Sequence, residues 1–278
     1  MTTDTPRPLV DAAWLRGALD RPDLVVLDLR TPPAGGFIPG SVHSDYGTAG
    51  WRATVDGVPG LLPETAALER LIGGVGIGNG HHVVLVAAGE TAADVGNATR
   101  VYWTFKALGH DRLSVLDGGF AAWAADPANP VADAPATRPP AAFQAAPRPA
   151  LRATLAAVQA AVADGDAPLL DTRSAEQFAG LSKSPAARAA GTLPGAVHIE
   201  NVAFYSAAER RFVPADRVRA LAAAAGAAEA PIAFCNTGHL ASVAWFALSE
   251  LAGIEGVRLY DGSMAEWSAD PARPLKNG

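Results

Sequence analysis

The feature that most constrains the fold of this chain is an internal duplication. Three short motifs recur in the same order in both halves: an apolar run ending in Asp-x-Arg, a Pro-Gly-x-Val-His turn, and an Asp-Gly pair followed by a tryptophan. They occupy residues 25–30, 37–43 and 114–123 in the first half and residues 168–173, 192–198 and 258–267 in the second. Such a repeat predicts two copies of one domain, and 278 residues are enough for two domains of ordinary size.

The apolar segments of each half predict a mostly parallel sheet. Residues 83–86 and 232–234 are continuous apolar runs, and helical stretches follow them at 101–108 and 241–251. Continuous apolar strands that alternate with helices are typical of α/β domains. We therefore predict an α/β fold with two tandem domains, each a mostly parallel sheet flanked by helices on both faces.

The boundary between the two domains is expected in a proline-rich segment. Residues 126–150 contain seven prolines and little apolar periodicity, which is typical of an extended linker. The predicted division is residues 1–125 as the first domain, residues 126–150 as the linker, and residues 151–278 as the second domain.

Composition argues against several classes of function. The net charge of −6, without a clustered basic surface, argues against nucleic-acid binding. The start of the chain has no apolar run of signal-peptide type, and no later stretch reaches membrane-spanning length without charges, so we expect a cytoplasmic protein without membrane contact. The single cysteine leaves no internal disulfide and no thiolate cluster for zinc, and we expect neither a metal nor a cofactor. The pair His81-His82 has no nearby ligand pattern and is expected at the surface.

The single cysteine, Cys235, directly follows the predicted strand 232–234 and precedes a helix. Ligands of open α/β sheets collect beyond the carboxyl ends of the strands. A loop containing Gly238 can turn several amide N–H groups toward one atom, and the positive end of the next helix adds to this field. Both effects favour a nucleophilic thiolate and would equally stabilise the anionic sulfur of a persulfide. The alternative is a buried structural cysteine. The first half has no cysteine at 87–92, which favours a reactive loop kept in one copy only.

Together these motifs resemble those of the rhodanese family in its tandem-domain form, which includes thiosulfate and 3-mercaptopyruvate sulfurtransferases. The resemblance covers nearly the whole chain, with a Cys-x-x-Gly-x-x-Ala loop and the segment 260–263 beside the repeated motifs. It implies a non-catalytic first domain and a second domain whose cysteine takes a sulfane sulfur from a small anionic donor. A thiophilic acceptor such as cyanide or a thiol would then receive that sulfur. By this resemblance Cys235 is the persulfide carrier, and the remaining site residues are Asn236, Thr237, Gly238, His239, Leu240 and Ala241 of the loop, with Asp171 beside it and Arg173 in support.

The loop and its surroundings depart from both branches of the family. The loop reads Cys-Asn-Thr-Gly-His-Leu, which matches neither branch, and Gln177 stands where an arginine often binds the donor. Phe37 replaces a histidine of the proton relay proposed for mercaptopyruvate enzymes. Thiosulfate is therefore the favoured donor, with 3-mercaptopyruvate as the alternative.

Three further residues have two possible roles each. Lys183 or Arg188, from an insertion of the second half, would bind the donor anion, or both would lie on a solvated loop. His239 would assist the substrate or lie at the rim of the pocket.

Two other functions compete with that of a sulfurtransferase enzyme. A phosphatase or arsenate reductase would need an arginine to close the loop around an oxyanion, whereas positions 241 and 242 are alanine and serine. A persulfide relay that receives sulfur from a protein partner would use the same residues, and the sequence does not separate it from the enzyme. We expect a monomer, because a tandem repeat already buries a pseudo-dimeric interface.

Overall fold

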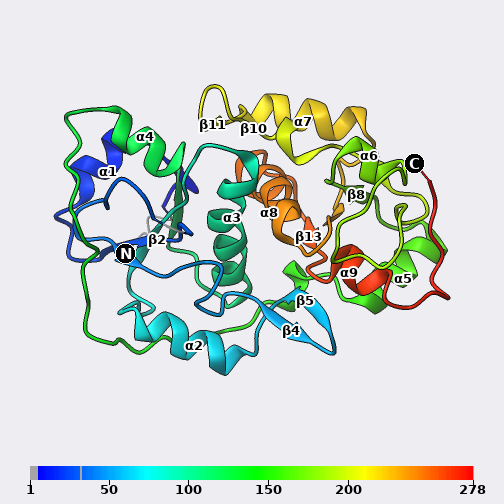
Figure 1. Cartoon of the computed structure of the whole chain (residues 1–278), viewed down its shortest axis with the longest axis horizontal. Helices are drawn as coiled ribbons and strands as arrows, with labels where there is room; N and C mark the ends of the chain where they lie inside the picture. Colours follow the sequence, from blue (N-terminus) through cyan, green and yellow to red (C-terminus); the bar gives the residue numbers. More distant parts are fainter. Residues whose placement is uncertain (1–5, 32, 278) are drawn as a thin grey trace. The chain divides into compact units, whose positions relative to one another are not determined.

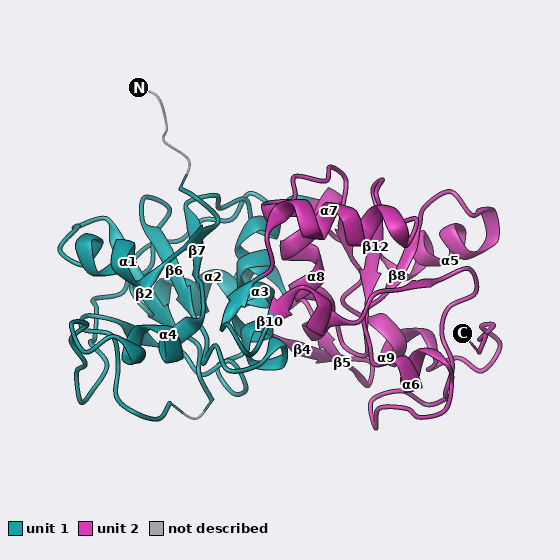
Figure 2. Ribbon diagram, turned by 90° about the horizontal axis from the view of Figure 1, so that it is seen from above, with its two compact units in different colours: residues 1–51, 63–148, 206–212 teal, residues 52–62, 149–205, 213–278 magenta. Residues whose placement is uncertain are grey.

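The structure is a computed structural model that describes residues 6–31 and 33–277. The chain forms two compact units, which Figure 2 colours separately. Unit 1 consists of the residues up to Trp51, Pro63–Arg148 and Ser206–Phe212, and unit 2 of Arg52–Leu62, Pro149–Tyr205 and the residues from Val213 onward. Each unit is a parallel sheet flanked by helices, as predicted from the sequence.

Unit 1 is built on a five-stranded sheet in the order β1-β7-β6-β2-β3, in which all neighbouring strands are parallel. Its strands are β1 (Leu9–Val10), β2 (Leu24–Asp28), β3 (Val42–His43), β6 (His82–Val86) and β7 (Leu113–Leu116). Its helices are α1 (Ala12–Ala18), α2 (Thr65–Gly74), α3 (Ala92–Ala107) and α4 (Gly119–Ala125). Every residue of β2 and β6 is buried, which explains their nearly continuous apolar sequence.

Alternate residues of the central strands pack on different helices. Val26 and Val84 share a core cluster with Leu15 of α1 and Trp123 of α4. Their neighbours along each strand face the opposite side of the sheet, where α3 lies against β6 and β7. Figure 1 shows α1 and α4 on one side of β2 and α3 on the other. The sheet therefore has two covered faces.

Unit 2 repeats this plan with the strand order β13-β12-β8-β9, again all parallel. A bridge between Arg152 and Leu259 takes the place that β1 has in unit 1. The strands are β8 (Leu169–Asp171), β9 (Val197–His198), β12 (Ile232–Phe234) and β13 (Arg258–Leu259). The α-helices are α5 (Leu155–Asp164), α6 (Ala175–Phe178), α7 (Ala215–Ala224), α8 (His239–Trp245) and α9 (Ser263–Trp267). Shorter elements are the 3₁₀ turns η1 (Pro149–Leu151) and η2 (Asn201–Ala203) and the π-helical turn η3 (Phe246–Leu251).

Each half of the sequence contributes a short segment to the unit formed mainly by the other half. The hairpin of β4 (Ala53–Val55) and β5 (Val58–Leu61) belongs to unit 2, where the Leu62 N–H donates to Asp261 Oδ2 at 2.7 Å. The second half contains β10 (Tyr205–Ser206) and β11 (Arg211–Phe212), and its segment Ser206–Phe212 belongs to unit 1. There the Phe212 N–H donates to Asp117 Oδ1 at 2.9 Å. Asp117 and Asp261 are the aspartates of the repeated Asp-Gly motif, so the same motif position holds the exchanged segment in both units.

The proline-rich segment packs along unit 1. The Ala141 N–H donates to Gly73 O at 2.9 Å, and the Ala146 N–H donates to Leu108 O at 2.8 Å. Phe143, between them, is buried. The domain limits at 125 and 151 remain predictions, since the compact units also exchange the two segments described above. Across residues 6–31 and 33–277, no helix has both the length and the apolar character needed to cross a membrane.

The two motif aspartates differ in their electrostatic surroundings. Asp261 is fully buried and forms an ion pair with Arg152, whose Nε lies 2.8 Å from Oδ1. Within the part of the chain that the structure describes, Asp117 has no ion-pair partner. Burial raises the pKa of Asp117 to about 6, although the N–H of Phe212 and the nearby charge of Arg211 oppose this shift. One copy of the motif thus holds a compensated carboxylate and the other an uncompensated one.

Replacement of Asp117 by Asn is expected to stabilise unit 1 at neutral pH. Between pH 3.8 and about 6 the folded state binds more protons than the unfolded state, so the free energy of unfolding falls as the pH rises through this window. An amide at this position still accepts the Phe212 N–H but carries no charge. We expect a gain of about 1–3 kcal/mol at about pH 7.5 and almost none at about pH 3.5, measured by urea unfolding.

Asp261→Asn is the matched control for this prediction. It removes the charge that compensates Arg152, so we expect a loss of about 1–3 kcal/mol at about pH 7.5. If both substitutions changed the free energy of unfolding in the same direction at that pH, the electrostatic account of Asp117 would be wrong.

Candidate active site

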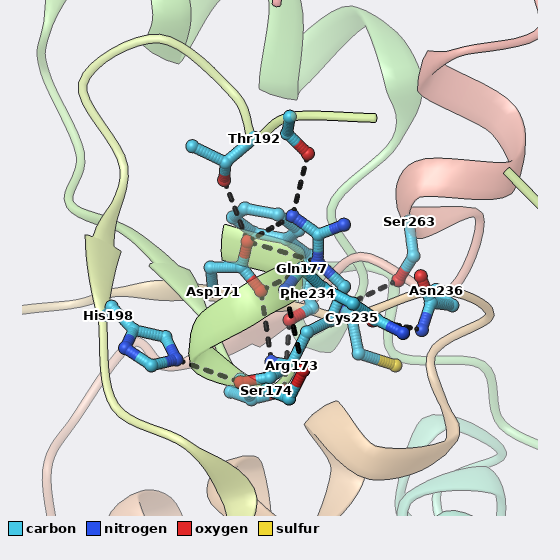
Figure 3. Close-up of polar contacts among 12 residues, drawn as sticks. Asp171, Arg173, Ser174, Gln177, Thr192, His198, Phe234, Cys235, Asn236 and Ser263 are labelled. Atoms are coloured by element: carbon cyan, nitrogen blue, oxygen red, sulfur yellow. Dashed lines mark hydrogen bonds and ion pairs between the residues drawn. The ribbon is translucent and has the colours of Figure 1, made fainter. Parts of the chain in front are cut away.

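Cys235 lies at the carboxyl end of β12, in the middle of the unit 2 sheet. Phe234, the last residue of β12, pairs with Asp171, the last residue of β8. The backbone N–H and the hydroxyl of Thr172 both donate to Phe234 O at 3.0 Å, which joins the two strand ends. The Cys235 side chain is buried, and in Figure 3 its sulfur points away from the Asp171 carboxylate. The cysteine therefore lies at the end of a strand, as predicted from the sequence.

A single hydroxyl group, that of Ser263, holds both ends of the turn that follows Cys235. Ser263 Oγ accepts the N–H of Cys235 and the N–H of Gly238, each at 3.0 Å, and donates to Tyr260 O at 2.7 Å. Gly238 has φ 68°, the left-handed conformation that favours glycine, and it is the N-cap residue of α8. Ser263 itself has φ 50°, which costs a non-glycine residue about 1 kcal/mol or more. The three hydrogen bonds of the hydroxyl give a physical reason why a serine stands here despite this conformational cost.

The carbonyl groups of the loop are turned toward the start of α9. Cys235 O accepts the Met264 N–H at 3.1 Å, and Asn236 O accepts the Ala265 N–H at 3.0 Å. In a trans peptide the C=O and the following N–H point in opposite directions. The N–H groups of Asn236 and Thr237 are therefore turned away from α9, and no described residue accepts a hydrogen bond from either of them.

The polar groups around Cys235 suit an anion better than a metal ion. In residues 6–31 and 33–277 there is no group of three or more histidine, cysteine, aspartate or glutamate side chains that could hold a metal ion. The two outward N–H groups are donors that lack an acceptor within the described part of the chain, and the N-terminal end of α8 adds a positive partial charge. A thiolate or a terminal persulfide sulfur is the kind of acceptor that such groups stabilise.

The corresponding loop of unit 1 begins at Ala87. Asp28 pairs with Val86 in unit 1 just as Asp171 pairs with Phe234 in unit 2, so the residue after Val86 is the counterpart of Cys235. The Phe120 and Ala121 N–H groups donate to Ala87 O and Ala88 O at 2.9 Å, matching the contacts of α9 in unit 2. The two loops therefore share these two carbonyl contacts. They differ in that the following helix begins one residue earlier in unit 2 and that the left-handed residue is Gly89 in unit 1 and Gly238 in unit 2.

The loop of unit 1 differs in holding an anion of its own. The N–H groups of Gly89, Glu90 and Thr91 donate to the carboxylate of Asp94 at 2.7, 3.1 and 2.7 Å. In unit 2 the matching residue is Ser242 when counted from Cys235 and Ala241 when counted from the helix cap. The Ser242 hydroxyl donates to His239 O at 2.6 Å. The loop that contains the cysteine has no carboxylate at this position.

Asp171 and Arg173 form a fully buried ion pair beside the loop. The Asp171 carboxylate accepts Arg173 Nη2 at 2.6 Å and the Thr192 hydroxyl at 2.7 Å, and both charged side chains are 0% exposed. Arg173 Nη2 also donates to Gly191 O at 2.8 Å, while His198 Nε2 donates to Arg173 O at 2.8 Å (Figure 3).

The same arrangement occurs in unit 1, where Arg30 pairs with Asp28 at 2.6 Å and His43 donates to Arg30 O at 3.0 Å. Because the unit without a cysteine has the pair as well, its role is to fix the strand end. Asp171 and Arg173 therefore lie at the strand end beside the loop. A direct contact of either residue with substrate stays a prediction.

Gln177 and Asn236 form a neutral amide pair next to the cysteine. Gln177 lies in α6, whose cap residue Ser174 accepts the Gln177 N–H at 3.4 Å. Asn236 Nδ2 then donates to Gln177 Oε1 at 2.9 Å, and Asn236 Oδ1 is buried without a partner among the described residues. At position 177, where family members often have an arginine, this chain therefore has an amide that is hydrogen-bonded to the loop.

The remaining loop residues are distributed between the hairpin and α8. Thr237 lies against Gly60 of the β4–β5 hairpin, where an added Cβ would come within 2.6 Å of Thr237 O. His239 and Leu240 are half-buried in the first turn of α8, and Ala241 is fully buried behind them. The pocket roles of Thr237, His239, Leu240 and Ala241 stay predictions.

The two cations proposed to bind the donor lie in the insertion before the Pro-Gly turn. Lys183 Nζ donates to Ala187 O at 2.9 Å, and the Arg188 N–H donates to Ser268 Oγ at 2.9 Å. Both residues are exposed, and neither has a hydrogen bond or ion pair with residues 235–241 in the part of the chain that is described. A substrate contact of Lys183 or Arg188 therefore stays a prediction.

Ser263 is the residue that sequence reasoning did not single out. Its signal lies in the repeat, because Gly119 occupies the same motif position in unit 1 with φ 56°. A serine in place of a glycine at a left-handed position indicates that the side chain is needed. Only the half with the cysteine has that hydroxyl.

Comparison with known proteins agrees with the duplicated architecture. The Rhodanese-like domain matches residues 11–126 and 154–270. A relative from Mycobacterium leprae (strain TN), named "Putative thiosulfate sulfurtransferase", is 30% identical over 97% of this chain and 98% of its own. One from Pseudomonas aeruginosa, named "Probable 3-mercaptopyruvate sulfurtransferase", is 32% identical over 97% of this chain and 98% of its own. The solved structure of the Escherichia coli 3-mercaptopyruvate sulfurtransferase SseA superposes with a TM-score of 0.77 at 23% identity, over 93% of this chain and 99% of that one.

Ser263→Gly is expected to impair sulfur chemistry at Cys235 while leaving the fold intact. Glycine adopts the left-handed conformation without strain but lacks the hydroxyl that holds the N–H groups of Cys235 and Gly238. Misplacement of the loop should lower the rate of any reaction at the sulfur by about tenfold or more. The measurement is the rate of Cys235 alkylation by iodoacetamide across pH, together with the melting temperature.

The matched control is Gly119→Ser in unit 1, which adds a hydroxyl where no cysteine stands. It should cost stability and leave the alkylation rate unchanged. An unchanged alkylation profile in Ser263→Gly would contradict the role assigned to the hydroxyl.

Proposed function

This chain belongs to the rhodanese family, and we propose that it is a sulfurtransferase that carries sulfane sulfur as a persulfide on Cys235. One observation carries the proposal: a lone cysteine begins a loop that offers two outward N–H groups, and neither has an acceptor among the described residues. In unit 1 three N–H groups of the corresponding loop hold the carboxylate of Asp94, which supports an anion-holding role for a loop at this strand end.

Two steps complete the proposed cycle, with thiosulfate as the favoured donor. The Cys235 thiolate attacks the sulfane sulfur, the sulfur–sulfur bond of the donor breaks, and sulfite leaves with the electron pair. The enzyme is left with a persulfide whose terminal sulfur is anionic. A thiophile such as cyanide then attacks that sulfur, the sulfur–sulfur bond of the persulfide breaks, and the thiolate is restored as thiocyanate leaves. The N–H groups of the loop would stabilise the anionic sulfur in both states.

The choice of thiosulfate rests on two supports. The Mycobacterium leprae relative is named as a thiosulfate enzyme and matches along nearly its whole length. Phe37, at the position of the relay histidine of mercaptopyruvate enzymes, packs within unit 1, with its ring centroid 5.4 Å from the Arg30 guanidinium carbon and 5.8 Å from the His43 ring centroid. An aromatic hydrocarbon ring at this position transfers no proton. 3-Mercaptopyruvate remains the alternative donor, as the name of the Pseudomonas aeruginosa relative suggests.

A persulfide relay is the second candidate, and the Gln177–Asn236 pair favours it. Neutral amides stand where cations would attract a free dianion, so small anionic donors gain less electrostatic attraction at the loop. A protein donor brings its own binding surface and depends less on such charges. Relay and enzyme would share the Cys235 persulfide.

Mass spectrometry of the intact protein separates these functions. We expect thiosulfate to add one sulfur atom to the wild-type chain, cyanide to remove it, and Cys235→Ser to show no addition. If neither thiosulfate nor 3-mercaptopyruvate gives an adduct but a cysteine desulfurase loads the protein rapidly, the protein is a persulfide relay. The proposal of an enzyme that acts on small donors is then wrong. Sulfur addition that persists in Cys235→Ser would refute both.

The double variant Lys183→Ala with Arg188→Ala tests the proposed donor contact. Loss of two cations near the donor should raise KM for thiosulfate by about fivefold or more with little change in kcat, because the lost attraction acts on binding. Arg217→Ala is the control, since Arg217 is an exposed cation on α7. If KM is the same in the double variant and the control, the insertion is only a surface loop.

A further inference from the structure

Unit 1 contains a cavity of about 420 Å³ that lies away from the carboxyl ends of its strands. It opens where β6 and β7 begin, next to α1. Three arginines, Arg7, Arg21 and Arg112, line it together with the rings of Trp14 and His82. Substrates of open α/β sheets collect at the opposite edge, so this cavity is not part of the loop site just described.

The charges that line this cavity leave an excess of positive charge. Asp23 is the carboxylate that pairs with the cluster, with Oδ2 at 2.9 Å from Arg21 Nη2 and 2.6 Å from Arg112 Nη2. The Arg7 side chain has no hydrogen bond or ion pair with any described residue. Each guanidinium has five N–H donors, so all three arginines keep donors for a further acceptor. Among the described residues, three cations against one carboxylate give the cluster a net charge of about +2.

His82 forms part of the wall of the cavity as a neutral ring. It is 1% exposed, in contrast to the surface position expected from the sequence, because it begins β6 in the middle of the sheet. Ser114 Oγ donates to Arg7 O at 2.6 Å, so toward His82 it can only accept, and Nε2 must donate to it at 2.9 Å. Nδ1 is then an acceptor, buried without a partner among the described residues.

Several charged groups act on the protonation of His82. Desolvation lowers its pKa to about 4, and the charges of Arg21 and Arg112 act in the same direction, with a smaller contribution from His110. Asp23 opposes them. The ring of Trp14, from α1, lies against His82 with centroids 5.6 Å apart. A negative charge added to the cavity would therefore raise the pKa of His82.

Unit 2 has small side chains at the matching positions. Counting back along the paired strands, Ala230 corresponds to His82 and Gly256 to Arg112. Counting from the helix caps, Ala157 corresponds to Trp14, since each N–H donates to its N-cap side chain. The features that both units share serve the fold, as the Asp-x-Arg pairs illustrate. The cluster in unit 1 is absent from unit 2, and the fold does not require it.

We propose that this cavity binds a small organic anion that carries a flat ring. Arg7 and Arg21 would receive a phosphate or carboxylate group, for which the planar guanidinium is well suited. Trp14 would offer its face to the ring of the ligand. A volume of about 420 Å³ lies in the range of cavities that hold small ligands.

Adenosine 5′-monophosphate is a suitable probe, because it joins a flat ring to a phosphate. We expect calorimetry on the full chain to give a Kd of about 1 mM or tighter, and NMR to show a rise in the pKa of His82 on binding. Adenosine, which lacks the charge, and inorganic phosphate, which lacks the ring, should each bind about tenfold more weakly.

Three variants make this test specific. Arg7→Ala removes a cation without a described partner, and Trp14→Leu removes the ring but keeps an apolar side chain, so each should weaken binding of adenosine 5′-monophosphate by about fivefold or more. Arg217→Ala, on unit 2, should not weaken it. The proposal is overturned if the probe does not bind at about 10 mM, if it binds Arg7→Ala as tightly as wild type, or if inorganic phosphate binds as tightly as the nucleotide.

Discussion

The buried ion pair between Asp171 and Arg173 is the interaction on which the geometry of unit 2 depends. Both side chains are 0% exposed, and the carboxylate accepts hydrogen bonds from the guanidinium, from the Arg173 backbone and from the Thr192 hydroxyl. Removal of one partner from such a pair costs about 3–5 kcal/mol, because the remaining charge stays buried. The pair therefore fixes the end of β8, and through the backbone pairing of Asp171 with Phe234 it fixes the residue before Cys235. The strand end that leads to the cysteine is therefore held by a network outside the loop, whereas Ser263 and α9 hold the loop itself.

The duplication provides a control within the molecule for each assignment of a role. The Asp-x-Arg pair, the histidine that donates to its backbone, and the aspartate that holds the exchanged segment occur in both units, so they belong to the fold. At the carboxyl edge of the sheets, the differences concentrate in the loop. Cys235 replaces Ala87, Ser263 replaces Gly119, and Ser242 replaces the Asp94 that supplies a carboxylate in unit 1. Together these three changes place a thiol on the loop, tie two of its N–H groups to the Ser263 hydroxyl and remove the carboxylate that the loop of unit 1 holds.

Sequence patterns predicted the parts of this structure that depend on local chemistry. The apolar runs, the turn glycines and the order of the motifs were enough to place Cys235 at the end of a parallel strand. The contacts that shape the loop join distant residues: Ser263 lies 28 residues from Cys235, and Gln177 lies 59 residues from Asn236. Such contacts depend on how neighbouring strands and helices pack, which a local pattern does not encode. His82 was wrongly expected at the surface for the same reason, since only the strand order places it between β2 and β7.

The exchange of segments between the halves affects how the chain can fold during its synthesis. Unit 1 consists mainly of the first half, yet Asp117 obtains the Phe212 N–H only after the ribosome has added about a hundred further residues. Until then the first half exposes the surface that Ser206–Phe212 will cover, and the β4–β5 hairpin has no Asp261 to receive the Leu62 N–H. Domains of multidomain proteins usually fold one after another from the N-terminus. Here neither unit can complete its contacts alone, so the last steps of folding for both units must await the second half of the chain.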